Sequence, residues 1–325
     1  MKVILTGDVL QSESDHIHLD AIIYRIMEGA HEWEVTDSEA IWNSQWMQGA
    51  RAQHKELLTK ATTHGAYPTI HKQRVTVTAV SDPNDPWALA PAVAAKFLAQ
   101  PLIILVENAF TDSMFINAVL RTLASRALLE LCQKVSDAIR CQGAGGIGEI
   151  PKHVKDIVKE SKDKGVPPRL VVLADSDGTA PGLLSGPAQA VKACCLKHNI
   201  PCLILRKRAI ENYIPDELFN RWSSEPSQTS TRSRMAALLR LGADQRDHFP
   251  VKKGFSAGCV SPEENELYSS VPPEDRELLK KGFGDDIIQL FDTYRGDLSK
   301  AGLCHRAGNG GKELDDLAGM IAAAI

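Results

Sequence analysis

The sequence predicts an α/β fold in which parallel strands are covered by helices. Three runs of consecutive apolar residues, at 102–106, 170–174 and 201–205, have the composition of strands that are buried on both faces. Segments with helical spacing of apolar residues lie between these runs. Apolar strands that alternate with helices in this way specify a parallel sheet with helices on both sides.

The segments around these strands complete the predicted main domain. We expect helices at 113–139, 152–164, 187–198 and 311–325, a glycine-rich turn at 143–148 and a polar loop at 223–230. The strands and the first three helices form a core at 101–220. A helical and basic region at 221–300 is predicted as an insertion before the last helix.

A chain of 325 residues is long enough for about two domains. We place the boundary between residues 81 and 100, where a segment with two prolines interrupts the pattern, and assign 1–90 and 91–325 to separate domains. The first is predicted as a smaller α/β domain with strands at 3–5 and 74–80 and helices at 20–29 and 38–61. Nothing in it has the spacing of a catalytic motif, so its function is not predicted.

Composition limits the class of protein. Lys and Arg total 37 against 41 Asp and Glu, a net charge of -4, which excludes a generally polybasic nucleic-acid binder. The seven cysteines are scattered without a C-x-x-C pair, which favours reduced thiols and gives no zinc signature. No apolar run approaches the roughly 20 residues of a membrane span. We therefore expect a cytoplasmic protein without a membrane contact.

Acidic side chains follow all three predicted strands of the main domain. Glu107 comes directly after the first strand, Asp175 and Asp177 follow the second, and Glu211 lies beyond the third. Asp112 follows Glu107 and could instead cap a helix that begins at residue 113 or 114. Because the carboxyl ends of parallel strands share one edge of a sheet, where ligands bind in such folds, we expect these carboxylates to lie close together.

Carboxylates gathered at one edge repel one another unless a cation compensates them. Oxygen ligands without His or Cys select Mg²⁺ or Mn²⁺ rather than zinc. Such ions neutralise phosphate charge, activate water and stabilise a leaving oxygen. The pattern therefore indicates metal-dependent phosphoryl or phosphodiester chemistry.

The same residues carry a family resemblance. The segment Leu105-Val106-Glu107 with Asp112, the glycine-rich turn, and then the sequence LADSD at 173–177 resemble the Toprim domain. This Rossmann-like, metal-binding domain is shared by topoisomerases, primases and overcoming-lysogenization-defect (OLD) nucleases. The later sequence IENYIP at 210–215 is similar to a segment of OLD-like and related standalone Toprim proteins. The resemblance covers roughly residues 100–220.

The resemblance implies a nuclease that cleaves DNA, or RNA, with two bound ions of Mg²⁺ or Mn²⁺. Glu107 would be an acid/base or a metal ligand, Asp175 and Asp177 would hold Mg²⁺, and Glu211 and Asp112 would be further ligands. Lys312, after the glycines at 310–311, resembles a lysine that lies near the metals in OLD-like proteins. The sequence departs from the family in having Asn108 where a glycine commonly follows the glutamate. Standalone members are often effectors of bacterial anti-phage systems, restrained by a partner protein or by oligomerisation.

The stretch 206–253 is richer in basic than in acidic residues, which is the local charge that a nucleic-acid backbone needs. Arg206, Lys207 and Arg208 lie nearest in sequence to the acidic residues. We therefore name them as candidate nucleic-acid contacts. A solvated helical surface is the alternative explanation for the basic residues that follow them.

Two other functions remain open from the sequence. The stretch 171–179 also resembles the opening motif of haloacid dehalogenase phosphatases, with Asp175 as nucleophile and Asp177 as acid/base. Lys280 or Lys281 and the acidic pair in 284–286 would then complete that site, but Glu107 would be left without a role. The second alternative is a non-catalytic Toprim-like module that binds a partner.

Overall fold

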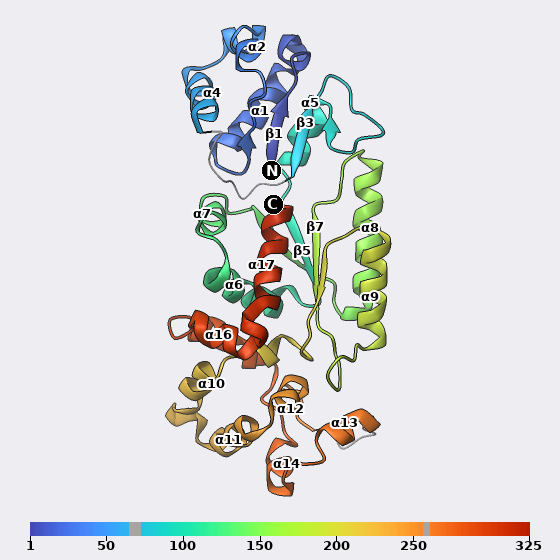
Figure 1. Cartoon of the computed structure of the whole chain (residues 1–325), viewed down its shortest axis with the longest axis vertical. Coiled ribbons are helices and arrows are strands. Elements are labelled where there is room, and N and C mark those ends of the chain that lie inside the picture. Colours follow the sequence, from blue (N-terminus) through green and yellow to red (C-terminus); the bar gives the residue numbers. More distant parts are fainter. Residues whose placement is uncertain (65–72, 256–260) are drawn as a thin grey trace.

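The computed structural model of the chain describes residues 1–64, 73–255 and 261–325. It contains two four-stranded sheets in which every neighbouring pair of strands is parallel. Figure 1 shows the first sheet near the N-terminus, the second in the middle of the molecule, and a group of short helices at the opposite end. The predicted α/β class with parallel sheets is confirmed.

The first sheet has the order β2-β1-β3-β4. Its strands are β1 (Lys2–Leu5), β2 (Glu32–Trp33), β3 (Arg74–Val77) and β4 (Ala88–Leu89). The helix predicted at 38–61 is divided into three helices, and Asp37 and Ser44 cap the starts of the first two. The helices of this part are α1 (His16–Met27), α2 (Ser38–Trp42), α3 (Gln45–Gly49), α4 (Ala52–His64) and α5 (Pro91–Leu98), and two 3-10 turns, η1 (Val9–Gln11) and η2 (Glu13–Asp15), precede α1.

Helix α5 belongs with the first sheet. It packs against α1, and Ala94, Phe97 and Leu98 are buried in the same core as Leu19 and Ile23. The first core therefore extends beyond residue 90, and the first strand of the second sheet begins at Leu102.

The second sheet has the order β6-β5-β7-β8, which repeats the strand order of the first. Its strands are β5 (Leu102–Val106), β6 (Ile139–Gly143), β7 (Leu170–Ala174) and β8 (Cys202–Ile204). Figure 1 shows α6 (Ala109–Leu123) and α17 (Lys312–Ala324) on one side of this sheet and α8 (Ile150–Asp163) and α9 (Gly186–Lys197) on the other. The three strands and the flanking helices 152–164 and 187–198 match the sequence prediction closely.

Strand β7 shows why the predicted strands had continuous apolar runs. Its side chains alternate between two cores, since successive residues of a strand point to opposite faces. Val171 and Leu173 are buried with residues of α6 and α17, whereas Leu170, Val172 and Ala174 are buried with residues of α8 and α9. A strand in this position needs an apolar side chain at every residue.

The long helix predicted at 113–139 is wrong in both extent and continuity. Helix α6 ends at Leu123, and Ser125 begins α7 (Arg126–Lys134) by accepting a hydrogen bond from the Leu128 amide. The chain then forms strand β6, which pairs with β5 at the edge of the sheet. The glycine-rich segment begins at the last residue of β6 and leads into a 3-10 turn, η3 (Ile147–Glu149).

Short helices follow β8 and precede α17. Among them, a 3-10 turn, η5, occupies most of the polar loop predicted at 223–230. They are η4 (Ile210–Tyr213), α10 (Asp216–Ser223), η5 (Pro226–Thr231), α11 (Arg232–Arg240), α12 (Ala243–His248), α13 (Pro262–Leu267), α14 (Pro273–Leu279), η6 (Asp285–Gln289), α15 (Leu290–Thr293), α16 (Lys300–Ala307) and η7 (Asn309–Gly311). Helix α17 then returns to the sheet, as predicted.

Six of the cysteines are free thiols in the described parts of the chain, and Cys259 lies outside them. Within residues 1–64, 73–255 and 261–325, we find no helix with the length and hydropathy that a bilayer crossing requires.

Candidate acidic site at the carboxyl edge of the second sheet

The predicted site residues lie where the strand order of the second sheet reverses direction. After β5 the chain adds β6 on one side, and then returns to add β7 on the other side of β5. Glu107 directly follows β5, and Asp175 directly follows β7. Open α/β sheets bind ligands in the crevice at such a switch point, because the two connections leave in opposite directions.

Backbone contacts with the segment after β8 fix the loop that carries Asp175 and Asp177. The Ile210 amide donates to Asp175 Oδ1 at 3.1 Å, and the Asp177 amide donates to the Arg208 carbonyl at 2.9 Å. Between them, Ser176 is fully buried, and its hydroxyl donates to the Lys207 carbonyl at 2.7 Å. The ends of β7 and β8 are thereby held together.

Asp177 has an unusual backbone conformation, with φ of 47°. Few residues other than glycine adopt positive φ, and such residues concentrate at functional sites. Its side chain is exposed, whereas Ser176 beside it is buried. The left-handed conformation therefore presents the Asp177 carboxylate to solvent at the carboxyl edge of the sheet.

The segment 210–213 forms the 3-10 turn η4, and its polar side chains hold it in place. The Asn212 amide group donates to the carbonyls of Arg246 and Phe249, both at 2.9 Å. The Tyr213 hydroxyl donates to Glu313 Oε2 at 2.6 Å. Glu211, between Ile210 and Asn212, is 1% exposed and forms an ion pair with Lys252, in which Nζ and Oε1 are 2.9 Å apart. The turn therefore buries a carboxylate beside the end of β7.

Helix α6 begins earlier than predicted, so Asp112 is not its cap. Asn108 Oδ1 accepts hydrogen bonds from the amides of Phe110 and Thr111, and α6 starts at Ala109. Asp112 lies inside the first turn and accepts a bond of 3.1 Å from the Asn108 amide. Asn108 is therefore the helix cap, and the interpretation of Asp112 as a cap at 113 or 114 is wrong.

We expect Asn108→Ala to lower the free energy of unfolding by about 1 kcal/mol, because the amides of Phe110 and Thr111 lose their acceptor. Asn108→Ser, which keeps an acceptor oxygen without adding a charge to the acidic site, serves as the matched variant. Urea unfolding at neutral pH measures both. Equal losses in the two variants would contradict the capping role.

Burial and neighbouring charges raise the pKa of four carboxyl groups at this edge. Burial is the largest cause of the raised pKa of Glu107, followed by the charges of Asp177 and Asp112. Burial, then Glu211 and then Asp112 raise the pKa of Asp175 well above its usual value. Burial also raises the pKa of Asp112 and Glu211. Glu107 and Asp175 are therefore close enough to Asp112, Asp177 and Glu211 for these charges to act on them.

Lys252 is a member of this site that the sequence analysis did not single out. It lies after α12, and its pKa is raised despite burial because Glu211, Asp175 and Asp112 stabilise the ammonium. Lys253 stands beside it in the sequence. The adjacent residues have the same chemistry, so no signal in the sequence distinguishes the lysine that faces the carboxylates.

In the part of the chain that the structure describes, no group of three or more His, Cys, Asp or Glu side chains is spaced to hold a metal ion as the side chains stand. The carboxylates share one electrostatic field without forming a ready-made coordination sphere. If these carboxylates bind a metal, their oxygens favour a hard divalent cation such as Mg²⁺.

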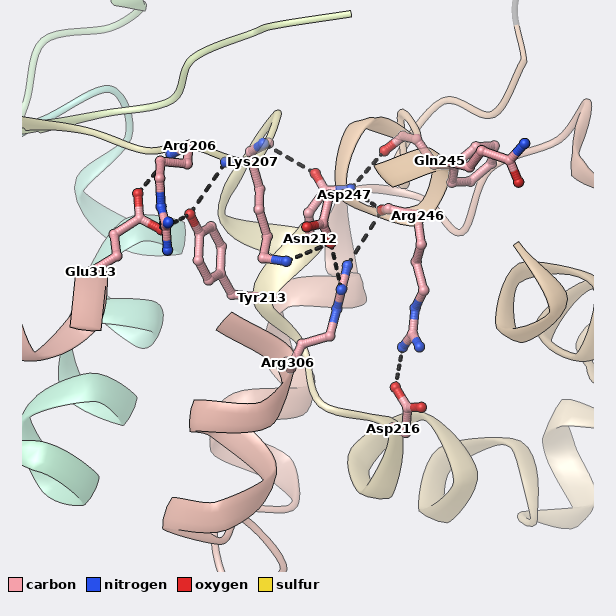
Figure 2. A network of polar contacts seen from close by, with 12 residues as sticks. Arg206, Lys207, Asn212, Tyr213, Asp216, Gln245, Arg246, Asp247, Arg306 and Glu313 are labelled. Carbon is pink, nitrogen blue, oxygen red and sulfur yellow. Dashed lines mark hydrogen bonds and ion pairs between the residues drawn. The ribbon is translucent and has the colours of Figure 1, made fainter. Parts of the chain in front are cut away.

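The three predicted nucleic-acid contacts are all ion-paired within the protein. Arg206 pairs with Glu313 at 3.3 Å, and Arg208 pairs with Glu264 at 3.4 Å. Lys207 is 4% exposed and pairs with Asp247. Figure 2 shows that Arg206 and Lys207 turn toward their partners in one network. Their role in binding nucleic acid stays a prediction.

Lys312 begins α17 on the exposed surface. Its ammonium pairs with both carboxylate oxygens of Asp316, one turn further along the helix, at 2.6 and 2.7 Å. The neighbouring Glu313 is buried instead and binds the Arg206 amide at 2.6 Å. The first turn of α17 therefore meets the segment after β8 through Glu313, and a catalytic role of Lys312 stays a prediction.

No family model, curated protein or solved structure matches the chain. The fold and the site define its class on their own. It is an α/β protein with two parallel sheets of the same strand order, and five electrostatically coupled carboxylates and one lysine lie at the switch point of the second.

Proposed function

We propose that the chain is a Toprim-type nuclease that hydrolyses phosphodiester bonds of DNA, or of RNA, with Mg²⁺ or Mn²⁺. The observation that carries the proposal is the coupling of Glu107, Asp112, Asp175, Asp177 and Glu211 at the switch point of a parallel sheet. Carboxylates held together without enough compensating charge form a site that favours a cation. Phosphodiester hydrolysis is the chemistry that such a site serves best.

The donor set fits the metal that the proposal needs. Glu107 and Asp177 at the edge of the sheet would hold a divalent ion together with Asp175, and Glu211 and Asp112 would be further ligands. When bound, the ion would neutralise the phosphate and lower the pKa of an attacking water. Of the five, Glu211 is buried and already ion-paired with Lys252, whereas Asp177 is exposed.

The chain's own residues have separate roles in this proposal. Glu107 has a raised pKa and a partly exposed side chain, which suits a carboxyl that takes up or releases a proton. Lys252 holds Glu211 in place and keeps a positive charge beside the carboxylates. The hydrogen bond from Ile210 orients the Asp175 carboxyl. A positioned acid, a fixed cation and oriented oxygen ligands are the parts that hydrolysis of a phosphodiester requires.

The proposal includes the setting that the family resemblance implies. The protein would act in the cytoplasm as an effector of a bacterial anti-phage system. A regulatory protein partner or a homo-oligomer would restrain it until infection.

The test is cleavage by the purified full chain. Supercoiled plasmid, single-stranded DNA and RNA are incubated with Mg²⁺, with Mn²⁺ or with EDTA, and the products are resolved on gels. We expect cleavage of at least one nucleic acid with either metal and none with EDTA. Cleavage that persists in EDTA would overturn the metal-dependent mechanism.

The phosphatase alternative is tested in the same experiment with p-nitrophenyl phosphate. In the structure, Lys280 pairs with Glu277 on the surface, and the acidic pair of 284–286 enters η6 instead of following a strand. Phosphatase activity that needs Asp175 but not Glu107 would favour this alternative. Absence of any hydrolysis would favour a non-catalytic binding module.

A further inference from the structure

A cavity lies on the same edge of the sheet as the acidic site, beside β8. Its volume is about 530 Å³, within the usual range for small-molecule sites. The walls come from the loop between β7 and α9, the end of β8, helix α12 and the turn between α16 and α17. The cavity therefore lies at the carboxyl end of a parallel strand, which is where ligands bind in such sheets.

One end of the cavity is basic. Arg206 and Lys207 contribute to its wall, and Arg306 lies behind them. Figure 2 shows how these cations share their partners. Lys207 and Arg306 both pair with the same oxygen of Asp247, Arg306 at 2.5 Å, so that one carboxylate faces two positive charges.

The network around this wall has more positive than negative groups. Arg206, Lys207, Arg246 and Arg306 face three carboxylates, those of Asp216, Asp247 and Glu313. Lys192 and Asp244 also line the cavity, and their opposite charges leave the surplus of positive charge unchanged. A partly buried network with surplus positive charge favours the binding of an anion.

Two buried donors of the network have no hydrogen-bond partner among the residues that the structure describes. They are the Nε atoms of Arg246 and Arg306. Burial, followed by the charge of Arg306, lowers the pKa of Lys207 to about 8. Arg246 and Arg306 do not line the cavity, so the positive charge of this network that a ligand meets there is that of Arg206 and Lys207. An anion at the cavity wall would supply the missing charge.

Other residues of the cavity lining are apolar. Pro181, Leu183 and Leu184 from the loop after β7, together with Ile204 of β8, face the same space. Leu183 is 40% exposed, which is high for a leucine. A ligand that fills the cavity therefore needs an anionic end and a body with an apolar face.

We propose that this cavity binds a nucleoside monophosphate, with the phosphate near Arg206 and Lys207 and the base against Leu183 and Leu184. A phosphate alone is smaller than the cavity, and a neutral nucleoside leaves the positive charge uncompensated. The inference does not depend on the nuclease proposal, because none of the five acidic-site carboxylates lines this cavity.

The test is calorimetric titration of the full chain with AMP in the presence of EDTA, so that metal binding at the acidic site plays no part. We expect saturable binding of AMP, competition by inorganic phosphate, and no saturable binding of adenosine. Adenosine that binds as tightly as AMP, or the absence of AMP binding, would overturn the proposal.

Two variants locate the ligand. Arg206→Ala removes an exposed cation of the wall, and Leu183→Trp fills the apolar side from an exposed position. We expect each to weaken AMP binding by about tenfold or more, because a charged hydrogen bond or the space for the base is lost. AMP binding like that of the wild type in either variant would refute this location.

Two controls complete the design. Lys197→Ala removes an exposed lysine of α9 that does not line the cavity, and it should bind AMP like the wild type. Thermal unfolding without ligand shows whether the variants are folded. Glu107→Gln should also bind AMP normally, so that the outcome for this cavity is independent of the outcome for the nuclease.

Discussion

Glu107→Gln and Asp175→Asn are each expected to lower metal-dependent cleavage by about 10³-fold or more. Each replaces a carboxylate that would hold the ion with a neutral amide of the same shape. A metal supplies several kcal/mol of charge stabilisation to the transition state, and each 1.36 kcal/mol lost is a tenfold loss of rate. Single-turnover cleavage of the preferred nucleic acid measures the effect.

Asp175→Asn should at the same time raise the free energy of unfolding of the metal-free protein at neutral pH. The pKa of Asp175 is raised well above its unfolded value, so ionisation of this carboxyl destabilises the folded state as the pH rises above about 4. An asparagine avoids that charge, and its Oδ1 can still accept the hydrogen bond from the Ile210 amide. Urea unfolding in EDTA checks the direction, and the difference from the wild type should shrink below pH 4.

An exposed acid away from the site provides the control. Asp156→Asn removes the charge of an exposed carboxylate on α8, and we expect no change in cleavage. Full activity in Glu107→Gln or in Asp175→Asn would remove that residue from the site. Loss of activity together with loss of stability in Asp175→Asn would indicate a structural role instead.

The strands and the acidic residues could be predicted because each has a local signal. Strands β5 and β7 are buried on both faces and therefore have unbroken apolar runs. Glu107 and Asp175 stand directly after those runs, and the rule for parallel sheets places them at one edge. Strand β6 had no such signal, because it is an edge strand and contains Arg140 and Gln142 among its five residues.

The partners of charged residues could not be predicted, because they are set by tertiary packing. Arg206 pairs with Glu313, and Lys207 pairs with Asp247. Both acids come from helices far along the chain, and a cluster of basic residues in the sequence does not show that its charges are already paired. The same limit applied to Lys252, which the sequence does not distinguish from Lys253 and which pairs with Glu211 in the folded chain.

Lys252→Met is expected to lower the free energy of unfolding of the metal-free protein by about 2 kcal/mol. Breaking a buried ion pair costs about 3 to 5 kcal/mol because the remaining charge is left without a partner. Glu211 is 1% exposed, but the Lys252 side chain is 34% exposed, so solvent already screens part of the interaction. Urea unfolding in EDTA measures the loss.

The double variant Lys252→Met with Glu211→Gln separates the ion pair from packing. It removes the buried charge as well as its partner, so we expect it to regain most of the lost stability. If the carboxylates bind a divalent cation, Mg²⁺ should stabilise Lys252→Met more than it stabilises the wild type, because the ion replaces the missing ammonium charge. A Lys252→Met protein that is as stable as the wild type in EDTA would show that Glu211 is neutral when buried, and Lys252 would then have no role in holding the acidic site together.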